Sequence, residues 1–426
     1  MKKYSILIAL LINIMQVNAQ VVSTLTASPS FINPLGITAD VSGYLYVADY
    51  QKIKKINSST GAISILAGAN SVGSNNGTGT AASFNTVEGI TYDSLGNLYV
   101  ADHYNNMIRK VVISSGVVTT VAGSTTSGLV NGVGTAAKFN GPIAVACDGK
   151  GNLFVTDGYN NVIRKIVLSN GAVSTLAGSS TAGSMNGTGT AAQFNTPDGI
   201  TCDGNGNLYV TEKFNHQIRK IEISTGVVTT FAGSLSNDAS IDGIGTSAGF
   251  INPYGICYDG KGSLYVADDS SNQVRKIDIS TGNVTTIAGS TTPGNVNGLG
   301  TAARFKQPYA IICDIHGDLF ITDNGNYEVR KITGLPTSIE NIFLSNNEIK
   351  LFPNPTNCLF NLSISQFDNL KMYSIEVYNT IGDCVRRQNA ASANCQIDLR
   401  SLENGIYNIS VISNEGMVNK RVIITK

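Results

Sequence analysis

The 426-residue sequence has no tryptophan, only three histidines and no excess of either charge. Its 29 lysines and arginines are matched by 29 aspartates and glutamates, and charged residues make up only 14% of the chain. A protein held to nucleic acid through phosphate contacts carries a basic surplus, so we expect no nucleic-acid partner. Only 10 prolines occur beside 45 glycines, and this balance favours strands and tight turns over helices.

Long apolar runs are missing beyond the first twenty residues. Two lysines at positions 2 and 3 precede an apolar stretch over 6–15, and Val17 and Ala19 occupy the positions that a signal peptidase recognises. We interpret residues 1–19 as a signal peptide whose removal leaves Gln20 first, with a buried strand or short anchor as the alternative. The stretch is too short to span a bilayer, and we expect no transmembrane segment elsewhere.

Internal repetition dominates the sequence after this segment. A phenylalanine opens each of six units, at spacings of 53, 55, 55, 56 and 55 residues. Each unit contains four short strand-like segments separated by polar turns, which is the size of one propeller blade. The sequence therefore predicts an all-β fold with a six-bladed β-propeller. The phenylalanines are Phe31, Phe84, Phe139, Phe194, Phe250 and Phe305.

The two ends of the repeat region predict how the ring closes. The last strand of a unit has the pattern Val-x-Thr-aliphatic, and the sixth unit stops at Gly334 without it. The missing copy stands at the start of the mature chain, where residues 22–25 are identical to residues 173–176. We therefore expect the N-terminal strand to complete the last blade, because closure removes an exposed sheet edge.

Three strings recur in these units: Phe-x-x-Pro-x-Gly-Ile, Gly-Asn-Leu-Tyr-Val-Ala-Asp and Asn-x-Ile-Arg-Lys. They resemble NHL repeats, and the resemblance covers residues 20–334 with six recurrences. It implies an NHL-type propeller. NHL propellers include RNA binders, protein scaffolds, a lyase and metal-dependent lactonase relatives, so the resemblance leaves the function open.

The C-terminal region follows a different pattern. Residues 335–345 read as a linker, and the alternating strands within 346–426 predict a small β-sandwich of immunoglobulin-like type. Its Pro-Asn-Pro-Thr string, Ile381-Gly382 turn, Gly-Ile-Tyr string and basic strand-forming end resemble the C-terminal sorting domain of the type IX secretion system of Bacteroidetes. The resemblance implies the type IX machinery as a partner, passage through the periplasm, and release or attachment at the cell surface.

Seven cysteines is an odd number, so at least one is unpaired if no partner chain takes part. Cys257 and three cysteines at equivalent repeat positions read as small buried hydrophobic residues, since neighbouring repeats hold equivalent positions too far apart for a disulfide. One pair among the three C-terminal cysteines could oxidise, and the sequence leaves the pairing open. The two groups are Cys147, Cys202 and Cys313, and Cys358, Cys384 and Cys395.

Signals for catalysis are weak. His103 and His216 fall in the turns after the alternating strands at different offsets, and His316 lies in another turn. A metal site built across blades needs matched positions that face the centre, so we interpret these histidines as solvated turn residues. We expect no catalytic residue, metal or other cofactor, although the sequence leaves an enzymatic role open.

An acid ends each alternating strand, and an arginine follows seven residues later in five of the six units. A catalytic role calls for one special residue rather than six copies, so we predict structural pairing or turn capping. The acids are Asp49, Asp102, Asp157, Glu212, Asp268 and Asp323, and the arginines are Arg109, Arg164, Arg219, Arg275 and Arg330.

Differences between the units are more informative about function. The residue before the Gly-Ile step differs between units, although the residues around it are nearly constant. We expect it at one mouth of the central channel. Aromatic residues in the turns after the alternating strands should open on the same face, although drift at an exposed position is the alternative. The ligand-binding candidates are Leu35, Glu88, Ile143, Asp198, Tyr254 and Tyr309, with the turn aromatics Tyr104, Tyr159, Phe214 and Tyr327.

Two functions fit this pattern. The first is a secreted or cell-surface binding or scaffold protein that presents the propeller face to an extracellular glycan or protein, because aromatic side chains among Asn and Ser suit such recognition. The alternative is a metal-dependent propeller enzyme, lactonase- or lyase-like, acting in the central channel. Glu88 and Asp198 are the only acids at the variable position and would be its best metal ligands.

Overall fold

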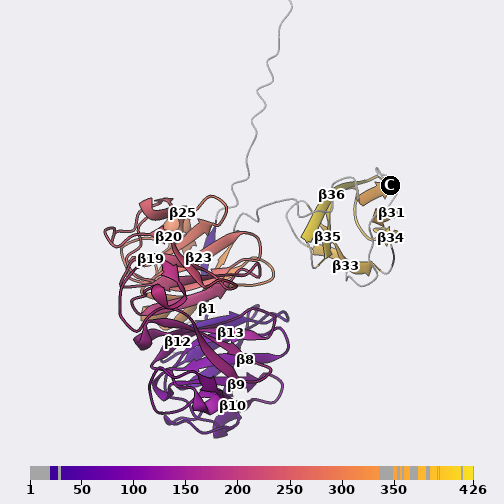
Figure 1. Cartoon of the computed structure of the whole chain (residues 1–426). Coiled ribbons are helices and arrows are strands. Elements are labelled where there is room, and N and C mark those ends of the chain that lie inside the picture. The colour runs from indigo at the N-terminus through magenta and orange to yellow at the C-terminus, as the bar shows by residue number, and fades with distance from the viewer. Residues whose placement is uncertain are drawn as a thin grey trace, which may run out of the picture. The chain divides into compact units, whose positions relative to one another are not determined.

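The computed structural model describes residues 20–26, 30–334, 349–352, 356, 359–364, 373–379, 384–390, 392, 394–413 and 416–425. The chain divides into two compact units, Met1–Thr337 and Ser338–Lys426 (Figure 1). The predicted signal peptide and linker lie outside the described residues. No helix in the described parts of the chain is long and apolar enough to cross a membrane.

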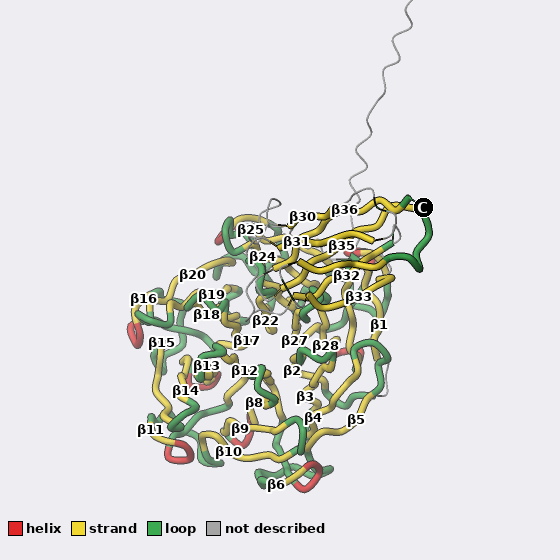
Figure 2. The backbone as a smooth tube through the Cα atoms, turned by 90° about the vertical axis from the view of Figure 1, so that its right-hand side faces the viewer, coloured by secondary structure: helices red, strands yellow, loops and turns green. Residues whose placement is uncertain are grey.

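The first unit is a closed ring of six antiparallel sheets, which confirms the predicted six-bladed propeller. Each innermost strand contacts the innermost strand of the next blade, and the last of them contacts the first. Figure 2 shows these strands around the centre of the ring. They are β2 (Pro34–Ala39), β7 (Val87–Tyr92), β12 (Pro142–Cys147), β17 (Pro197–Cys202), β22 (Pro253–Tyr258) and β27 (Pro308–Cys313).

The remaining strands of the first five blades follow outward in chain order, and in the last blade the N-terminal strand takes the fourth place. Second strands are β3 (Tyr44–Asp49), β8 (Asn97–Asp102), β13 (Asn152–Asp157), β18 (Asn207–Glu212), β23 (Ser263–Asp268) and β28 (Leu319–Asp323). Third strands are β4 (Lys52–Asn57), β9 (Met107–Val112), β14 (Val162–Val167), β19 (Gln217–Glu222), β24 (Gln273–Asp278) and β29 (Glu328–Thr333). Fourth strands are β5 (Ile63–Ala67), β10 (Val117–Gly123), β15 (Ala172–Ala177), β20 (Val227–Gly233), β25 (Asn283–Gly289) and β1 (Val21–Thr26).

Blades two to six gain a short fifth strand from the chain that crosses over from the preceding blade. Each is two residues long and pairs with the fourth strand of its sheet. The crossings therefore help to cover the outer edge of these blades. The short strands are β6 (Gly77–Thr78), β11 (Gly132–Val133), β16 (Gly187–Thr188), β21 (Gly243–Ile244) and β26 (Gly298–Leu299).

The N-terminal strand closes the ring as the sequence predicts. β1 lies between β29 and β26 in the sheet of the last blade, with Val22 opposite Ile332 and Val21 opposite Leu299. Val22 is buried in the apolar cluster of that blade, beside Phe305 and Ile332. Residues separated by most of the chain thus share one sheet, and the last blade has no unpaired edge where β1 sits.

The glycine of the Gly-Ile step lets the innermost strands approach one another closely. A Cβ atom at Gly89 would lie 2.5 Å from the Cα atom of Ala144, and one at Gly199 would lie 2.3 Å from the carbonyl oxygen of Tyr254. Both positions are therefore closed to larger side chains. This close contact brings the residues just before each step into one small region.

Buried acid–base pairs tie the turns to the strands, which confirms their predicted structural role. Asp102 Oδ2 lies 2.8 Å from an Arg109 guanidinium nitrogen, and both side chains are fully buried. Asp102 also accepts hydrogen bonds from the Asn85 backbone and the Asn105 side chain. Arg109 packs over the repeat-opening Phe84 ring. Equivalent ion pairs join Asp157 to Arg164, Glu212 to Arg219, Asp268 to Arg275 and Asp323 to Arg330, while Lys54 replaces the arginine beside Asp49.

The second unit contains a three-stranded and a four-stranded sheet, which confirms the predicted small β-sandwich. Leu362, Ile397, Val377 and Val411 contribute to one buried core between strands of both sheets. Six of the seven cysteines are free thiols, and Cys358 lies outside the described residues. The strands are β30 (Ile349–Phe352), β31 (Leu359–Ile364), β34 (Asn394–Asp398), β33 (Cys384–Ala390), β32 (Tyr373–Tyr378), β35 (Gly405–Ser413) and β36 (Gly416–Ile424).

Candidate functional site

A β-bulge places the variable residue of each unit at one end of the ring. In every blade, the pairing of the innermost strand with its neighbour shifts register at this residue and the Gly or Ala after it, as between Pro197 and Ile200. Bulges redirect side chains, and they are common beside functional sites. In three places a threonine of one blade donates a hydrogen bond to the bulge of the next blade. Thr156 donates to the Asp198 carbonyl, Thr211 to the Tyr254 carbonyl and Thr322 to the Leu35 carbonyl.

We call this end of the ring the channel mouth and define it by Glu88, His103, Asp198, Lys213, Tyr254, Asp269 and Tyr309. Tyr254 and Tyr309 come from adjacent blades, and their ring centroids are 4.6 Å apart with planes tilted by 38°. Both side chains are half-buried. They form the aromatic pair that the repeat spacing predicts.

Lys213 connects an acid to this aromatic pair. Its Nζ atom lies 3.4 Å from Asp198 Oδ2 and donates a 3.2 Å hydrogen bond to the Tyr254 hydroxyl. The same ammonium lies over the Tyr254 and Phe214 rings, 4.7 and 5.2 Å from their centroids. Burial opposes the charge of Lys213, but the field of Asp198 and the contacts with Tyr254 outweigh it and raise the Lys213 pKa.

Glu88 and His103 form the other side of the channel mouth. His103 Nδ1 lies 3.1 Å from the Pro142 carbonyl oxygen and 3.6 Å from Glu88 Oε1, while its Nε2 lies 3.4 Å from the Tyr159 hydroxyl. Burial lowers the His103 pKa, so the ring is neutral near pH 7. A neutral ring fits these contacts, with Nδ1–H donating to Pro142 and Nε2 accepting from Tyr159.

The carboxyl groups at the channel mouth have raised pKa values. Burial, followed by the field of Asp198, raises the pKa of Glu88 to about 8. Burial raises the pKa of Asp198 to about 6 against the opposing field of Lys213, and burial raises that of Asp269 to about 6. Glu88 is therefore largely protonated at pH 7, while the two aspartates are largely ionised. Perturbed carboxyl groups that converge in this way are typical of functional sites.

The other predicted ligand-binding residues differ from one another in exposure and position. Leu35 and Ile143 share the bulge position, but their side chains are buried and apolar, so they offer a ligand no hydrogen-bonding group. Tyr104, Tyr159 and Phe214 are exposed in the turns beside His103 and Lys213. Tyr327 is also exposed, but it lies two positions further along its turn, in a left-handed backbone conformation.

The structure corrects the interpretation of two histidines as solvated. His103 is only 3% exposed, because the neighbouring blade covers it and supplies its carbonyl partner. His216 is half-buried, with Nδ1 2.5 Å from the Ile251 carbonyl oxygen. His316 is exposed, as predicted.

Three residues of the channel mouth were not among the candidates: His103, Lys213 and Asp269. All three directly follow the acid that ends the second strand of their blade. The other units carry Tyr50, Gly158 and Asn324 at that position. At this position the residue varies between units although its neighbours are nearly constant. The same signal identified Glu88, and it would also have identified His103, Lys213 and Asp269.

The channel mouth does not fit a metal site. A protein metal site normally takes three or more side-chain ligands, whereas here the buried Asp198 pairs with the Lys213 ammonium. Across the described residues, no group of three or more His, Cys, Asp or Glu side chains is arranged to hold a metal ion.

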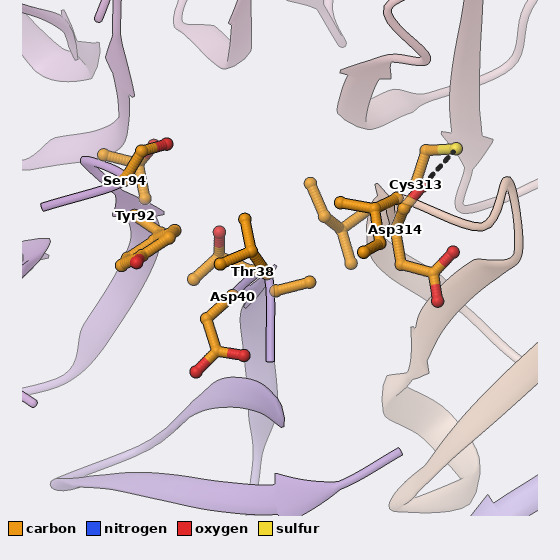
Figure 3. Close-up of a pocket in the computed structure, with 11 residues that line it drawn as sticks. Thr38, Asp40, Tyr92, Ser94, Cys313 and Asp314 are labelled. Carbon is orange, nitrogen blue, oxygen red and sulfur yellow. Dashed lines mark hydrogen bonds between the residues drawn. The ribbon is translucent and has the colours of Figure 1, made fainter. Parts of the chain in front are cut away.

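A separate pocket of about 250 Å³ opens at the opposite end of the innermost strands, between the first, second and sixth blades. Figure 3 shows Thr38, Tyr92, Ser94 and Cys313 among the residues that line it. Its carboxylates cap turns, since Asp40 accepts from the Ser42 and Tyr44 backbone and Asp314 accepts from the His316 and Asp318 backbone. This leaves the pocket with mainly apolar surface and hydroxyl groups.

The two units of the chain are similar to different known proteins. Residues 350–425 match the family described as the secretion system C-terminal sorting domain. NHL repeat-containing protein 2 from Bos taurus is 35% identical over 156 residues, which is 34% of this chain and 22% of that protein. The chain thus spans less than a quarter of the length of that relative.

Solved structures resemble the propeller at low sequence identity. A structural genomics protein of unknown function from Bacteroides thetaiotaomicron has a TM-score of 0.58 at 22% identity, over 74% of this chain and 76% of that chain. An auxiliary nutrient binding protein from the same organism has a TM-score of 0.56 at 15% identity, over 74% of this chain and 76% of that chain. The chain therefore combines a six-bladed propeller, similar to NHL-repeat proteins, with a secretion system C-terminal sorting domain in residues 350–425.

Proposed function

We propose that the protein is exported by type IX secretion and uses the channel mouth of its propeller to bind an extracellular glycan or protein. The sorting domain supports export, with release into the medium or attachment at the cell surface as the end point. The observation that carries the binding role is the pair formed by Tyr254 and Tyr309, which lies half-buried at the rim beside hydrogen-bonding groups.

The surroundings of this pair support recognition rather than a packed core. Tyr254 is bonded through its hydroxyl to Lys213, and the exposed rings of Phe214 and Tyr159 lie in neighbouring turns. Aromatic rings with polar rims stack on sugars and anchor peptides, and such residues dominate the binding energy of many interfaces. The bulges and buried ion pairs below them provide a rigid base, which limits the entropy lost on binding.

The alternative hypothesis is a lactonase- or lyase-like enzyme that holds a metal through Glu88 and Asp198. That hypothesis gains no support from the described residues, because no further His, Cys, Asp or Glu side chain joins Glu88 and Asp198 in an arrangement that could hold a metal ion. The binding role is therefore the better supported of the two.

A glycan and protein array probed with the full chain tests this proposal. We expect binding to specific spots that is lost in the Tyr254→Ala/Tyr309→Ala variant and kept in a control variant, Leu95→Ala, whose residue is exposed on the opposite face of the ring. Binding that survives the double substitution, or a chain that binds no spot on arrays covering both classes, would contradict the role of the channel mouth.

A further inference from the structure

We propose that the channel mouth binds a primary alkylammonium group, in the form of a lysine side chain presented by a partner protein. This inference rests on the proposed binding function and deepens it by naming the chemistry of the ligand. It follows from an imbalance of charge, a buried acceptor without a hydrogen bond, and aromatic surface suited to a methylene stem.

The charge imbalance comes from the three acids. The Lys213 ammonium pairs with Asp198, and its field also acts on Glu88 and Asp269. His103 does not restore the balance, because burial keeps its ring neutral. No lysine or arginine among the described residues lies within ion-pair distance of Glu88. The mouth therefore gains negative charge when Glu88 ionises, and this charge would attract a cation.

The buried acceptor is Asp198. Its side chain is 2% exposed, and among the described residues Oδ2 accepts no hydrogen bond although the Lys213 ammonium lies 3.4 Å away. A buried carboxylate oxygen without a hydrogen bond costs free energy that a donor from a ligand would recover. Glu88 keeps 15% of its side chain exposed, so it is accessible from the mouth.

The aromatic pair favours an alkyl stem over a compact cation. Lys213 shows the arrangement within the protein itself, because its ammonium lies over the Tyr254 ring while it pairs with Asp198. Cation–π contact of this kind becomes stronger as the ammonium group loses its water. Tyr309 offers a second ring beside Tyr254, against which the methylene groups of an incoming lysine would pack.

The pH dependence of binding follows from the groups that face Glu88. Asp198 and Asp269 each have a pKa of about 6, Lys213 has a raised pKa and stays charged, and the lowered pKa of His103 keeps its ring neutral at pH 7 and above. Burial and the nearby acids raise the pKa values of Tyr254 and Tyr309, and burial also raises that of Tyr159, so all three hydroxyls stay neutral. Between pH 7 and pH 9, Glu88 is the member of this set that loses its proton.

The test is calorimetric titration of the full chain with Nα-acetyl-lysine methylamide, using Nα-acetyl-norleucine methylamide as the uncharged control with a similar stem. We expect the lysine probe alone to bind, with an affinity that rises up to about tenfold from pH 7 to pH 9 as Glu88 ionises. Proton release should accompany binding near pH 8. Glu88→Gln should abolish the pH dependence, and Glu222→Gln should not, since Glu222 is exposed at the far end of its strand.

Three results would overturn the inference. They are equal binding of the norleucine probe, unchanged pH dependence in Glu88→Gln, and a Ca²⁺ ion that displaces the lysine probe with higher affinity. If the lysine probe fails while array binding still depends on Tyr254 and Tyr309, the ammonium inference is wrong and the proposed function stands. If neither is seen, both fail.

Discussion

Tyr254 and Tyr309 lie 55 residues apart in the chain, yet their ring centroids are 4.6 Å apart. The repeat brings them together, because each occupies the same bulge position in adjacent blades and the innermost strands of those blades pack closely at Gly255 and Ala310. Their partial exposure distinguishes them from four buried tyrosines of the second strands, which are Tyr46, Tyr99, Tyr209 and Tyr265. The same geometry that builds the ring therefore builds the aromatic pair.

We predict that Tyr254→Ala/Tyr309→Ala stays folded and melts close to the unmodified chain. Half-buried rings at the rim of the channel contribute less to the free energy of unfolding than fully buried rings do. Tyr209→Ala is the matched control, because Tyr209 is fully buried in the fourth blade and its loss should cost about 3–5 kcal/mol. Thermal melts of the two variants compare their losses of stability directly. A similar loss of stability in both would show that the Tyr254 and Tyr309 pair belongs to the core.

Closure by the N-terminal strand has a measurable consequence. Deleting residues 21–26 leaves the backbone groups of β29 without the partner strand that pairs with it from Val21 to Thr26. We expect the truncated protein to melt well below the full chain or to aggregate, because an unpaired edge exposes backbone donors and acceptors. Light scattering and calorimetry check this outcome. Unchanged melting and solubility would show that the ring does not need the strand.

The stability of the protein should fall with rising pH because of Glu88. Its pKa is about 8 in the folded protein, well above the ordinary value of 4.5, so the folded state holds a proton that the unfolded chain has released. Stability from this group is complete below about pH 4.5 and is lost as the pH rises through 8. Glu88→Gln removes the effect and should stabilise the protein at pH 9 by a few kcal/mol, because raising a pKa by one pH unit on folding corresponds to about 1.4 kcal/mol.

Denaturant titrations at pH 5 and pH 9 test this sign. Glu88→Gln and the unmodified chain should differ little at pH 5 and clearly at pH 9, with the variant the more stable. Glu222→Gln serves as the control for a change in net charge. A variant that is less stable than the unmodified chain at both pH values would show that the carboxylate makes a favourable contact in the folded protein.

Export depends on the second unit. Removing residues 346–426 should leave a folded propeller, since each unit has buried apolar clusters of its own. We expect the truncated protein to accumulate in the periplasm of its host instead of reaching the medium or cell surface. Cell fractionation with antibody detection measures its location, and normal appearance outside the cell would contradict the role of the sorting domain.

The sequence was sufficient to predict the ring and its closure. The period of the phenylalanines and the identity of residues 22–25 with 173–176 are local patterns that translate directly into blades and strand pairing. The pairing of Tyr254 with Tyr309 followed from the same period, because equivalent positions in adjacent blades must be neighbours.

Burial at the channel mouth could not be predicted in the same way. His103 looks like a turn residue in the sequence, but the next blade covers its ring and Pro142 bonds to it. Ile143 shares the bulge position with Glu88 but packs into the space left by Gly158 in its own blade. The first outcome depends on a contact between blades and the second on a glycine in a turn of the same blade, so neither follows from the residue's own position in the repeat.

The central claim is that ligands bind at the channel mouth rather than at the opposite end of the ring. The most direct test compares two variants of the full chain on one glycan and protein array. One carries Tyr254→Ala with Tyr309→Ala, and the other replaces the exposed Val41, Leu95 and Ile315 of the opposite face by serine. We predict that the first variant loses array binding and the second keeps it. Loss in the second variant with full binding in the first would contradict the account.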